Sequence, residues 1–211
     1  MDVSAVVLAG GKNRRLGKNK AQEIIGGKSL IEHVIERLRP LASQILIVTS
    51  PQQPDLTVTG TETLLDLYPG KGPLVGVYTG LTYSRFSRSI TVACDMPFLN
   101  TELLRYMIEL SGEFDAIVPR LGEGKVEPLH AIYSKSCLPV IEGRLERNQL
   151  GVHSFLKAMN VRYVEQDECQ RLDPELLSFF NVNYQSDLKR AAMLASVDSA
   201  ANRWELKKGS L

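Results

Sequence analysis

A glycine-rich, basic loop follows the first apolar segment and contains the residues best suited to chemistry. Residues 5–9 read Ala-Val-Val-Leu-Ala, and Gly10 and Gly11 come directly after them. Paired glycines let backbone N–H groups approach a ligand closely, and Arg15 and Lys20 add positive charge. These residue types predict a site for the phosphates of a nucleoside triphosphate. The loop has neither the Walker nor the dinucleotide spacing, so a strand-to-helix turn with solvated cations is the alternative.

Two aspartates lie where the carboxyl ends of strands are expected. Asp66 precedes the Pro-Gly-Lys-Gly-Pro run 69–73, and Asp95 follows the largely apolar run 89–94. Open α/β sheets bind ligands at the carboxyl ends of their strands. A carboxylate there can accept hydrogen bonds from a nucleotide base, which we predict for Asp66, or bind Mg²⁺, which we predict for Asp95. The alternative is a structural role, with Asp66 capping turn amides.

Strand and helix patterns alternate along the chain and must position these residues. Segment 29–38 has helical apolar spacing and a capping-box pattern, while 45–49 is typical of a strand buried on both faces of a parallel sheet. The expected strands cover 5–8, 45–49, 64–66, 89–94, 116–119, 127–133 (of mixed exposure) and 161–164, and the expected helices cover 29–38, 77–81, 101–110, 134–141, 152–159 and a segment from 186. This alternation predicts a three-layer α/β/α sandwich with a mostly parallel sheet. Leu8, Asp66 and Asp95 should reach one edge of it.

Length and composition indicate one domain. The 211 residues are 44% hydrophobic and 23% charged, and we expect a folded domain over 1–195 and a C-terminal tail over 196–211. A net charge of +1 gives no general attraction to nucleic acid or anionic membranes. Cys94, Cys137 and Cys169 lack metal-ligand spacing, which favours free thiols in the cytoplasm. No leader pattern or membrane-length apolar run is present, so neither secretion nor membrane insertion is expected.

Two further features allow alternative interpretations. His130 is either a general base or a histidine that is structural or positions a substrate. Arg144, Arg147 and Asn148 form a basic patch that is either a second anion site or a solvated face.

Taken together, the motifs resemble those of the molybdenum cofactor guanylyltransferases. The matching segments span about residues 3–195 and are Leu8-Ala9-Gly10-Gly11 with Arg15, Gly17 and Lys20; Asp66 with Pro69-Gly70-Lys71-Gly72-Pro73-Leu74; Cys94-Asp95-Met96-Pro97; Pro128-Leu129-His130-Ala131; and Asn181-Val182-Asn183. The resemblance implies a Rossmann-like nucleotidyltransferase fold. It also implies transfer of GMP from GTP to molybdopterin carrying molybdenum, with release of pyrophosphate.

The resemblance implies a role for each matching residue. The guanine and phosphate pocket would be lined by Leu8, Ala9, Gly10 and Gly11. The catalytic residues would be Arg15, Lys20 and Asp95. Lys20 would also contact the nucleotide, Asp66 would recognise it, and Asp95 would hold the Mg²⁺ cofactor. The pterin half of the cleft would contain His130, Asn181 and Asn183.

One position departs from the family pattern. The family commonly has a nucleotide-binding asparagine after the second strand, whereas this chain reads Ile47-Val48-Thr49-Ser50, so we expect the Thr49 hydroxyl in its place. The implied partners are GTP, molybdenum-molybdopterin, molybdopterin-synthesis proteins and acceptor molybdoenzymes. The alternatives are a related cytidylyl- or sugar-phosphate nucleotidyltransferase, or a non-catalytic module that binds GTP and delivers cofactor. A dinucleotide-dependent oxidoreductase is disfavoured because the fingerprint glycines are missing.

Overall fold

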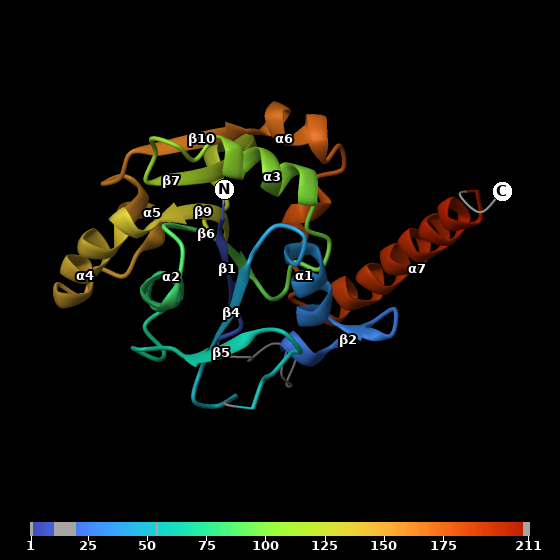
Figure 1. The fold of residues 1–211 in the computed structure, drawn as a ribbon, viewed down its shortest axis with the longest axis horizontal. Helices are drawn as coiled ribbons and strands as arrows, with labels where there is room; N and C mark the ends of the chain where they lie inside the picture. Colours follow the sequence, from blue (N-terminus) through green and yellow to red (C-terminus); the bar gives the residue numbers. More distant parts are fainter. Residues whose placement is uncertain (1, 11–19, 54, 209–211) are drawn as a thin grey trace.

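A sheet of eight strands forms the middle of the molecule, with helices on both of its faces (Figure 1). The computed structural model describes residues 2–10, 20–53 and 55–208, with side chains as far as residue 196. The strands of the sheet are β1 Ser4–Leu8, β4 Gln44–Thr49, β5 Glu62–Leu65, β6 Arg88–Ala93, β7 Ala116–Leu121, β8 Lys125–Val126, β9 His130–Ser134 and β10 Val161–Glu165. A separate hairpin consists of β2 Ile24–Ile25 and β3 Lys28–Ser29.

The α-helices and the short 3₁₀ turns lie between these strands. The helices are α1 Leu30–Leu38, α2 Pro73–Tyr83, α3 Thr101–Glu109, α4 Leu138–Glu146, α5 Val152–Leu156, α6 Gln166–Leu172 and α7 Gln185–Lys208. The 3₁₀ turns are η1 Lys20–Gln22, η2 Gly122–Gly124, η3 Lys135–Cys137 and η4 Leu177–Phe179. None of the helices in the described part of the chain is long and apolar enough to cross a membrane.

The strand order confirms the expected mostly parallel sheet. It is β10-β7-β9-β6-β1-β4-β5, with β8 paired to β7. Strand β9 is antiparallel to β6 and β7, and β8 is antiparallel to β7. The other neighbours pair in parallel.

Two apolar cores, one on each face of the sheet, join the sheet to the helices that cover it and so hold the three layers together. In β1, Ala5 and Val7 belong to the core with α1, α3 and α6, whereas Val6 and Leu8 belong to the core with α2, α4 and α5 (Figure 1). Every residue of β1 and β4 is buried. A strand covered on both faces needs apolar residues at successive positions, so the continuous apolar runs correctly predicted these central strands.

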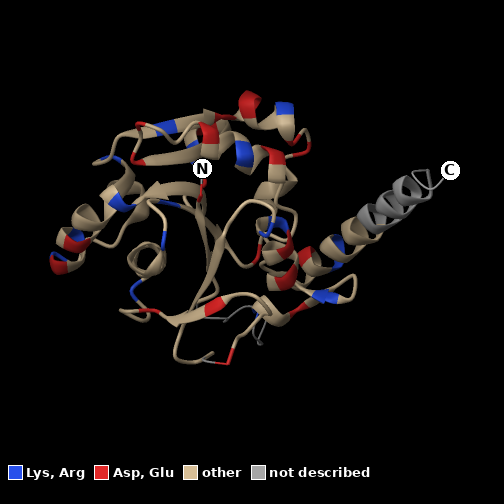
Figure 2. Ribbon diagram, viewed as in Figure 1, with Lys and Arg blue, Asp and Glu red and all other residues tan. Residues whose placement is uncertain are grey.

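Polar caps fix where the flanking helices begin. The Ser29 amide donates to the Glu32 carboxylate at 2.7 Å and the Ser29 hydroxyl accepts from the Glu32 amide, which confirms the predicted capping box of α1. The Asn100 side chain accepts from the amides of Glu102 and Leu103 at 2.9 Å and caps α3. Acidic and basic residues are interspersed over the described chain (Figure 2).

Several elements differ from the expectation. Strand β9 starts at His130, because 127–129 form a turn, and all five of its residues are buried instead of showing mixed exposure. Its place between β6 and β7 explains this burial. The β2–β3 hairpin and α6 were not expected. Helix α7 continues through 196–208, where a tail was expected, and its far half points away from the sheet (Figure 1). The division into domain and tail stays a prediction.

Two glycines one helical turn apart let α2 approach β1 closely. A Cβ on Gly76 would meet Leu8 Cδ2 at 3.1 Å. A Cβ on Gly80 would overlap the methyl groups of Val6, with Cγ2 at 2.8 Å. Val6 is fully buried in the central strand, so it has little room to move away. The glycines therefore allow the first turn of α2 to lie beside the carboxyl end of β1.

We expect Gly80→Ala to lower the free energy of unfolding by about 1–3 kcal/mol, because overpacking against Val6 outweighs the gain in helix propensity. Equilibrium urea unfolding measures this difference. Gly112→Ala is the matched control, since a Cβ at Gly112 meets nothing within 4 Å. Equal stability of the two variants would show that α2 is not in tight contact with β1.

Candidate active site

The order in which the strands are added puts a topological switch point at the carboxyl ends of β1 and β6, and we call this position the crevice. From β1 the chain moves outward to β4 and β5, and then returns to place β6 on the other side of β1. In the register, Leu8 lies beside Val48 of β4 and Ala93 of β6. The crossovers diverge at such a point, so side chains that follow the strands meet above the sheet edge. This is the predicted edge for Leu8, Asp66 and Asp95.

Backbone hydrogen bonds hold the start of the glycine loop at this edge. The Ala9 amide donates to the Val48 carbonyl at 2.8 Å, and the Cys94 amide donates to the Leu8 carbonyl at 3.1 Å. Leu8 and Ala9 are buried, whereas Gly10 is exposed. Gly10 is therefore the first loop residue with an open approach to a ligand. The predicted residues Gly11 and Arg15 lie outside the described residues.

Lys20, Asp95 and Asn183 meet at the crevice. The Lys20 ammonium forms an ion pair with Asp95 Oδ2 and donates to Asn183 Oδ1 at 2.8 Å. The side chains of Lys20 and Asp95 are only 17% and 16% exposed. The structure thus brings together residues that the sequence had assigned to the nucleotide, the metal and the pterin.

The segment that carries Asn183 is tied down on both sides. The Val182 amide donates to the Asp95 carbonyl at 3.0 Å, and the Val182 side chain packs in a small core with β2 and the first half of α7. The Asp187 carboxylate accepts from the amides of Asn183 and Tyr184 at 2.9 and 2.8 Å. Asp187 therefore positions Asn183, a role that the sequence analysis missed. Its signal is an acidic residue in the first turn of the last helix.

The oxygens of Asp95 and Asn183 fit a hard divalent cation. Asp95 Oδ1 is buried and has no hydrogen-bond partner within the described part of the chain. Carboxylate and amide oxygens are ligands of Mg²⁺, which completes its shell with water and phosphate oxygens. No cluster of three or more His, Cys, Asp or Glu residues that could hold a metal occurs among the described residues. A metal here would therefore depend on a ligand to supply further oxygens.

Asp66 is held in place at the end of β5. Its amide donates to the Thr49 carbonyl at 2.8 Å, and its Oδ1 accepts from the Thr79 hydroxyl at 3.0 Å and from the Tyr68 amide at 3.2 Å. Thr79 is fully buried in α2, so it fixes the orientation of the carboxylate. The bond to Tyr68 is the turn-capping contact of the structural alternative, while the half-buried carboxylate still lies at the predicted edge.

Thr49 is fully buried, and its hydroxyl donates to the Gln53 carbonyl at 3.1 Å. The hydroxyl proton would have to leave that carbonyl before it could reach a nucleotide. The neighbouring Ser50 is half-buried and lies against Gly10. A Cβ added to Gly10 would lie 3.6 Å from the Ser50 backbone nitrogen. The role of Thr49 in nucleotide binding stays a prediction.

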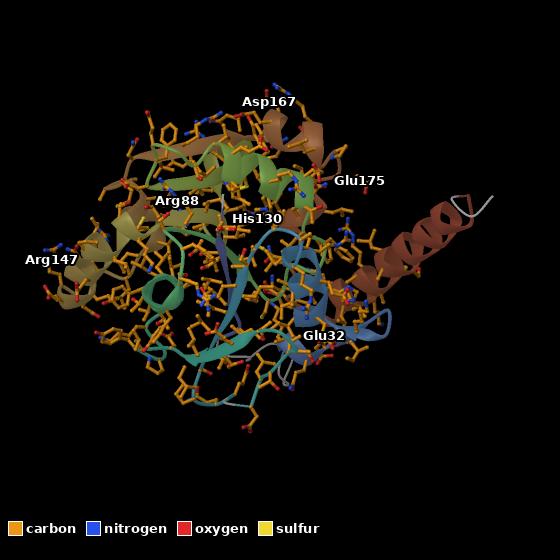
Figure 3. All side chains as sticks on the ribbon, in the orientation of Figure 1. Glu32, Arg88, His130, Arg147, Asp167 and Glu175 are labelled. Atoms are coloured by element: carbon orange, nitrogen blue, oxygen red, sulfur yellow. The ribbon has the colours of Figure 1, made fainter. Side chains whose placement is uncertain are left out.

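His130 lies inside the molecule and pairs with Val92 near the carboxyl end of β6, whereas Arg147 and Asp167 lie at the periphery (Figure 3). The centroids of the His130 and Phe179 rings are 4.8 Å apart, and neither nitrogen of the His130 ring has a hydrogen-bond partner in the described residues. Burial lowers the pKa of His130 from its usual 6.5 to about 3. Asn181 is half-buried and donates to the Phe179 carbonyl at 3.0 Å. His130 therefore supports the segment before Asn183 without being exposed to solvent.

The cysteines and the basic patch are not part of the cluster of Lys20, Asp95 and Asn183. Burial, with a smaller contribution from the Asp95 charge, raises the pKa of the Cys94 thiol to about 12, which disfavours a nucleophilic thiolate. Cys94, Cys137 and Cys169 are all buried and unpaired, as expected. The basic patch is at the end of α4, where an Arg144 guanidinium N–H donates to the Ser154 hydroxyl and Arg147 is exposed (Figure 3).

Comparison with known proteins gives similarities over most of the chain. A family model described as "MobA-like NTP transferase domain" matches residues 5–166. A "Probable molybdenum cofactor guanylyltransferase" of Pelotomaculum thermopropionicum is 35% identical over 204 residues, which covers 97% of this chain and 98% of the relative. A protein of the same name from Methanosarcina mazei is 38% identical, with 88% of each chain covered. Among solved structures, the molybdopterin-guanine dinucleotide biosynthesis protein A of Archaeoglobus fulgidus has a TM-score of 0.79 and 31% identity, over 92% of this chain and 99% of that chain.

We expect the His130→Leu variant to lose less stability than the wild type when the pH falls from 7 to 5. Because the pKa of His130 is near 3 in the folded state, only the unfolded state takes up its proton as the pH falls below 6.5. This difference destabilises the wild type by about 2 kcal/mol between pH 7 and pH 5, and the leucine variant should lack that contribution. Urea unfolding at both pH values measures it.

The exposed His153, replaced by glutamine, is the matched control for this comparison. Its variant should follow the wild type at both pH values. A His130→Leu variant that loses as much stability between pH 7 and pH 5 as the wild type would contradict a buried, neutral His130.

Proposed function

This chain belongs to the family of molybdenum cofactor guanylyltransferases, and we propose that it transfers GMP from GTP to molybdopterin carrying molybdenum. The product is the molybdopterin guanine dinucleotide cofactor, and pyrophosphate is released. The observation that carries this proposal is the meeting of Lys20, Asp95 and Asn183 at the sheet edge where β1 leads into the exposed Gly10. The enzyme is a nucleotidyltransferase, and its reaction needs a site that neutralises phosphate charge.

The transfer forms one phosphorus–oxygen bond and breaks another. A phosphate oxygen of molybdopterin attacks the α-phosphorus of GTP, and the bond from the α-phosphorus to the oxygen of the β-phosphate breaks. Such a reaction depends on alignment and charge neutralisation and needs no nucleophile from the protein. The buried, protonated Cys94 agrees with that requirement.

Lys20 supplies positive charge to the phosphates. Its ammonium lies at the carboxyl ends of β1 and β6, where the α-phosphate and the leaving pyrophosphate would lie. A cation at this place stabilises the charge that develops on the leaving oxygens. Backbone amides of the glycine loop, from Gly10 onward, and the Arg15 side chain would orient the rest of the triphosphate.

Asp95 and Asn183 would hold Mg²⁺, as the fit of their oxygens to a hard cation suggests. When bound, Mg²⁺ neutralises part of the negative charge of the phosphates. Asp187 keeps the backbone of Asn183 in place, and the bond between Val182 and Asp95 fixes the distance between the two segments. His130 packs against the Phe179 ring and Asn181 donates to the Phe179 carbonyl, so both would support the acceptor side of the site.

Asp66 would select the nucleotide. Its carboxylate is oriented by Thr79 and lies at the end of β5, on the far side of β4 from the catalytic cluster. A carboxylate there can accept from the ring N–H and amino groups of guanine, whereas cytosine offers one amino group and no ring N–H. This difference favours GTP over CTP. Molybdopterin-synthesis proteins would supply the pterin, and acceptor molybdoenzymes would receive the finished cofactor.

The proposal is tested by incubating the protein with each nucleoside triphosphate, Mg²⁺ and molybdenum-loaded molybdopterin. We expect a dinucleotide of the mass of the guanine product, together with stoichiometric pyrophosphate, from GTP alone. A cytidine product would identify the related cytidylyltransferase activity. GTP binding without any pyrophosphate release would identify a non-catalytic delivery module, and either result would refute the proposed reaction.

We expect Asp95→Asn to lower kcat by about 100-fold or more, because the variant loses the charge that holds the metal. Asp167→Asn is the matched control. Asp167 is exposed, pairs with Arg171 on α6 and lies at the periphery (Figure 3). Circular dichroism verifies that both variants are folded. Full activity of Asp95→Asn at saturating Mg²⁺ would remove Asp95 from the metal site.

A further inference from the structure

We propose that the Lys20 ammonium is an internal substitute for the divalent cation, so that the nucleotide-free enzyme excludes free metal until a triphosphate draws Lys20 away. This inference rests on the proposed function, because it concerns the same site. Its consequence is an order of binding, in which the nucleotide and the metal enter together.

Lys20 contacts one oxygen of each of the two residues that suit a metal, while Asp95 Oδ1 has no hydrogen-bond partner among the described residues. The ammonium forms its ion pair with Asp95 Oδ2 and donates to Asn183 Oδ1 at 2.8 Å. A cation bound between these oxygens would lie within a few ångströms of a second positive charge. Lys20 and the metal therefore compete for one position.

Low exposure makes this competition strong. With Lys20 and Asp95 only 17% and 16% exposed, a carboxylate that lost its cation would be left partly desolvated and unpaired. The ammonium prevents that state in the free enzyme. A free metal ion gains Asp95 Oδ2 and Asn183 Oδ1 only by forcing the ammonium out, and no phosphate is yet present to accept the hydrogen bonds of that ammonium.

The parts of the cluster differ in how firmly they are held. Asp95 and Asn183 are fixed to each other through Val182, and Asp187 holds the amide of Asn183. Lys20 begins the three-residue turn η1, and its side chain is a flexible four-carbon stem. Lys20 can therefore swing from the carboxylate to a phosphate while both oxygen ligands stay in place. When a triphosphate arrives with its own metal, Lys20 gains a phosphate and the metal gains the Asp95 carboxylate. Each cation then has an anionic partner.

The test is Mn²⁺ binding in the absence of nucleotide. The electron paramagnetic resonance signal of free Mn²⁺ measures how much of the ion is bound. We expect Lys20→Met to bind one Mn²⁺ at least about tenfold more tightly than the wild type, since the competing charge-assisted hydrogen bonds are gone. Lys28→Met is the matched control. Lys28 is half-exposed and pairs with Glu36, so its variant should bind Mn²⁺ as the wild type does. The double variant Lys20→Met, Asp95→Asn should lose the gain.

Addition of a non-hydrolysable GTP analogue should shrink the difference between wild type and Lys20→Met, because the phosphates then attract Lys20. Lys20→Ala repeats the measurement if the methionine variant does not fold. Mn²⁺ binding that is no tighter in the folded Lys20 variants than in the wild type would overturn the exchange. If wild-type transfer of GMP is intact in that case, only this inference fails. If Lys20→Met binds Mn²⁺ tightly but the wild type does not transfer GMP, the proposed function is overturned instead.

Discussion

One partly buried ion pair joins the segments on which the site depends. Lys20 and Asp95 are 75 residues apart, and Lys20 and Asn183 are 163 residues apart, yet their polar atoms are in contact. The end of the glycine loop, the turn after β6 and the segment before α7 are thereby held together. An unpaired carboxylate at this depth would be costly, so the pairing constrains the positions of all three segments.

The sheet supplies the frame for that contact. Parallel pairing of β1 with β4 and β6 puts the carboxyl ends of three strands at one edge, and the reversal of strand order puts the topological switch point there. The close contact of Gly76 and Gly80 with β1 brings α2, and with it Thr79, against the same edge. Thr79 in turn orients Asp66. The orientation of Asp66 thus depends on core packing, whereas the cluster of Lys20, Asp95 and Asn183 depends on electrostatics.

The sequence predicted the parts of this structure that depend on local patterns. Buried central strands require continuous apolar runs, and the capping box of α1 requires Ser29 and Glu32 three residues apart, so both were visible. The burial of β9 was not visible, because it comes from its antiparallel neighbours and not from its own alternation. The contact of Asn183 with Lys20 likewise leaves no local pattern. Asp187 was missed because an acidic residue in a first helical turn signals the start of a helix but does not identify the backbone amides that it binds.

The proposed exchange of Lys20 between a carboxylate and a phosphate would explain why this site uses lysine. The carboxylate of Asp95 needs a positive partner in the free enzyme, and the phosphates need one in the loaded enzyme. A guanidinium forms planar, bidentate pairs that are harder to exchange, whereas an ammonium is a point charge with rotatable donors. One lysine can therefore satisfy both anions in turn. The fixed positions of Asp95 and Asn183, set by Val182 and Asp187, are what allow that movement without loss of the cation site.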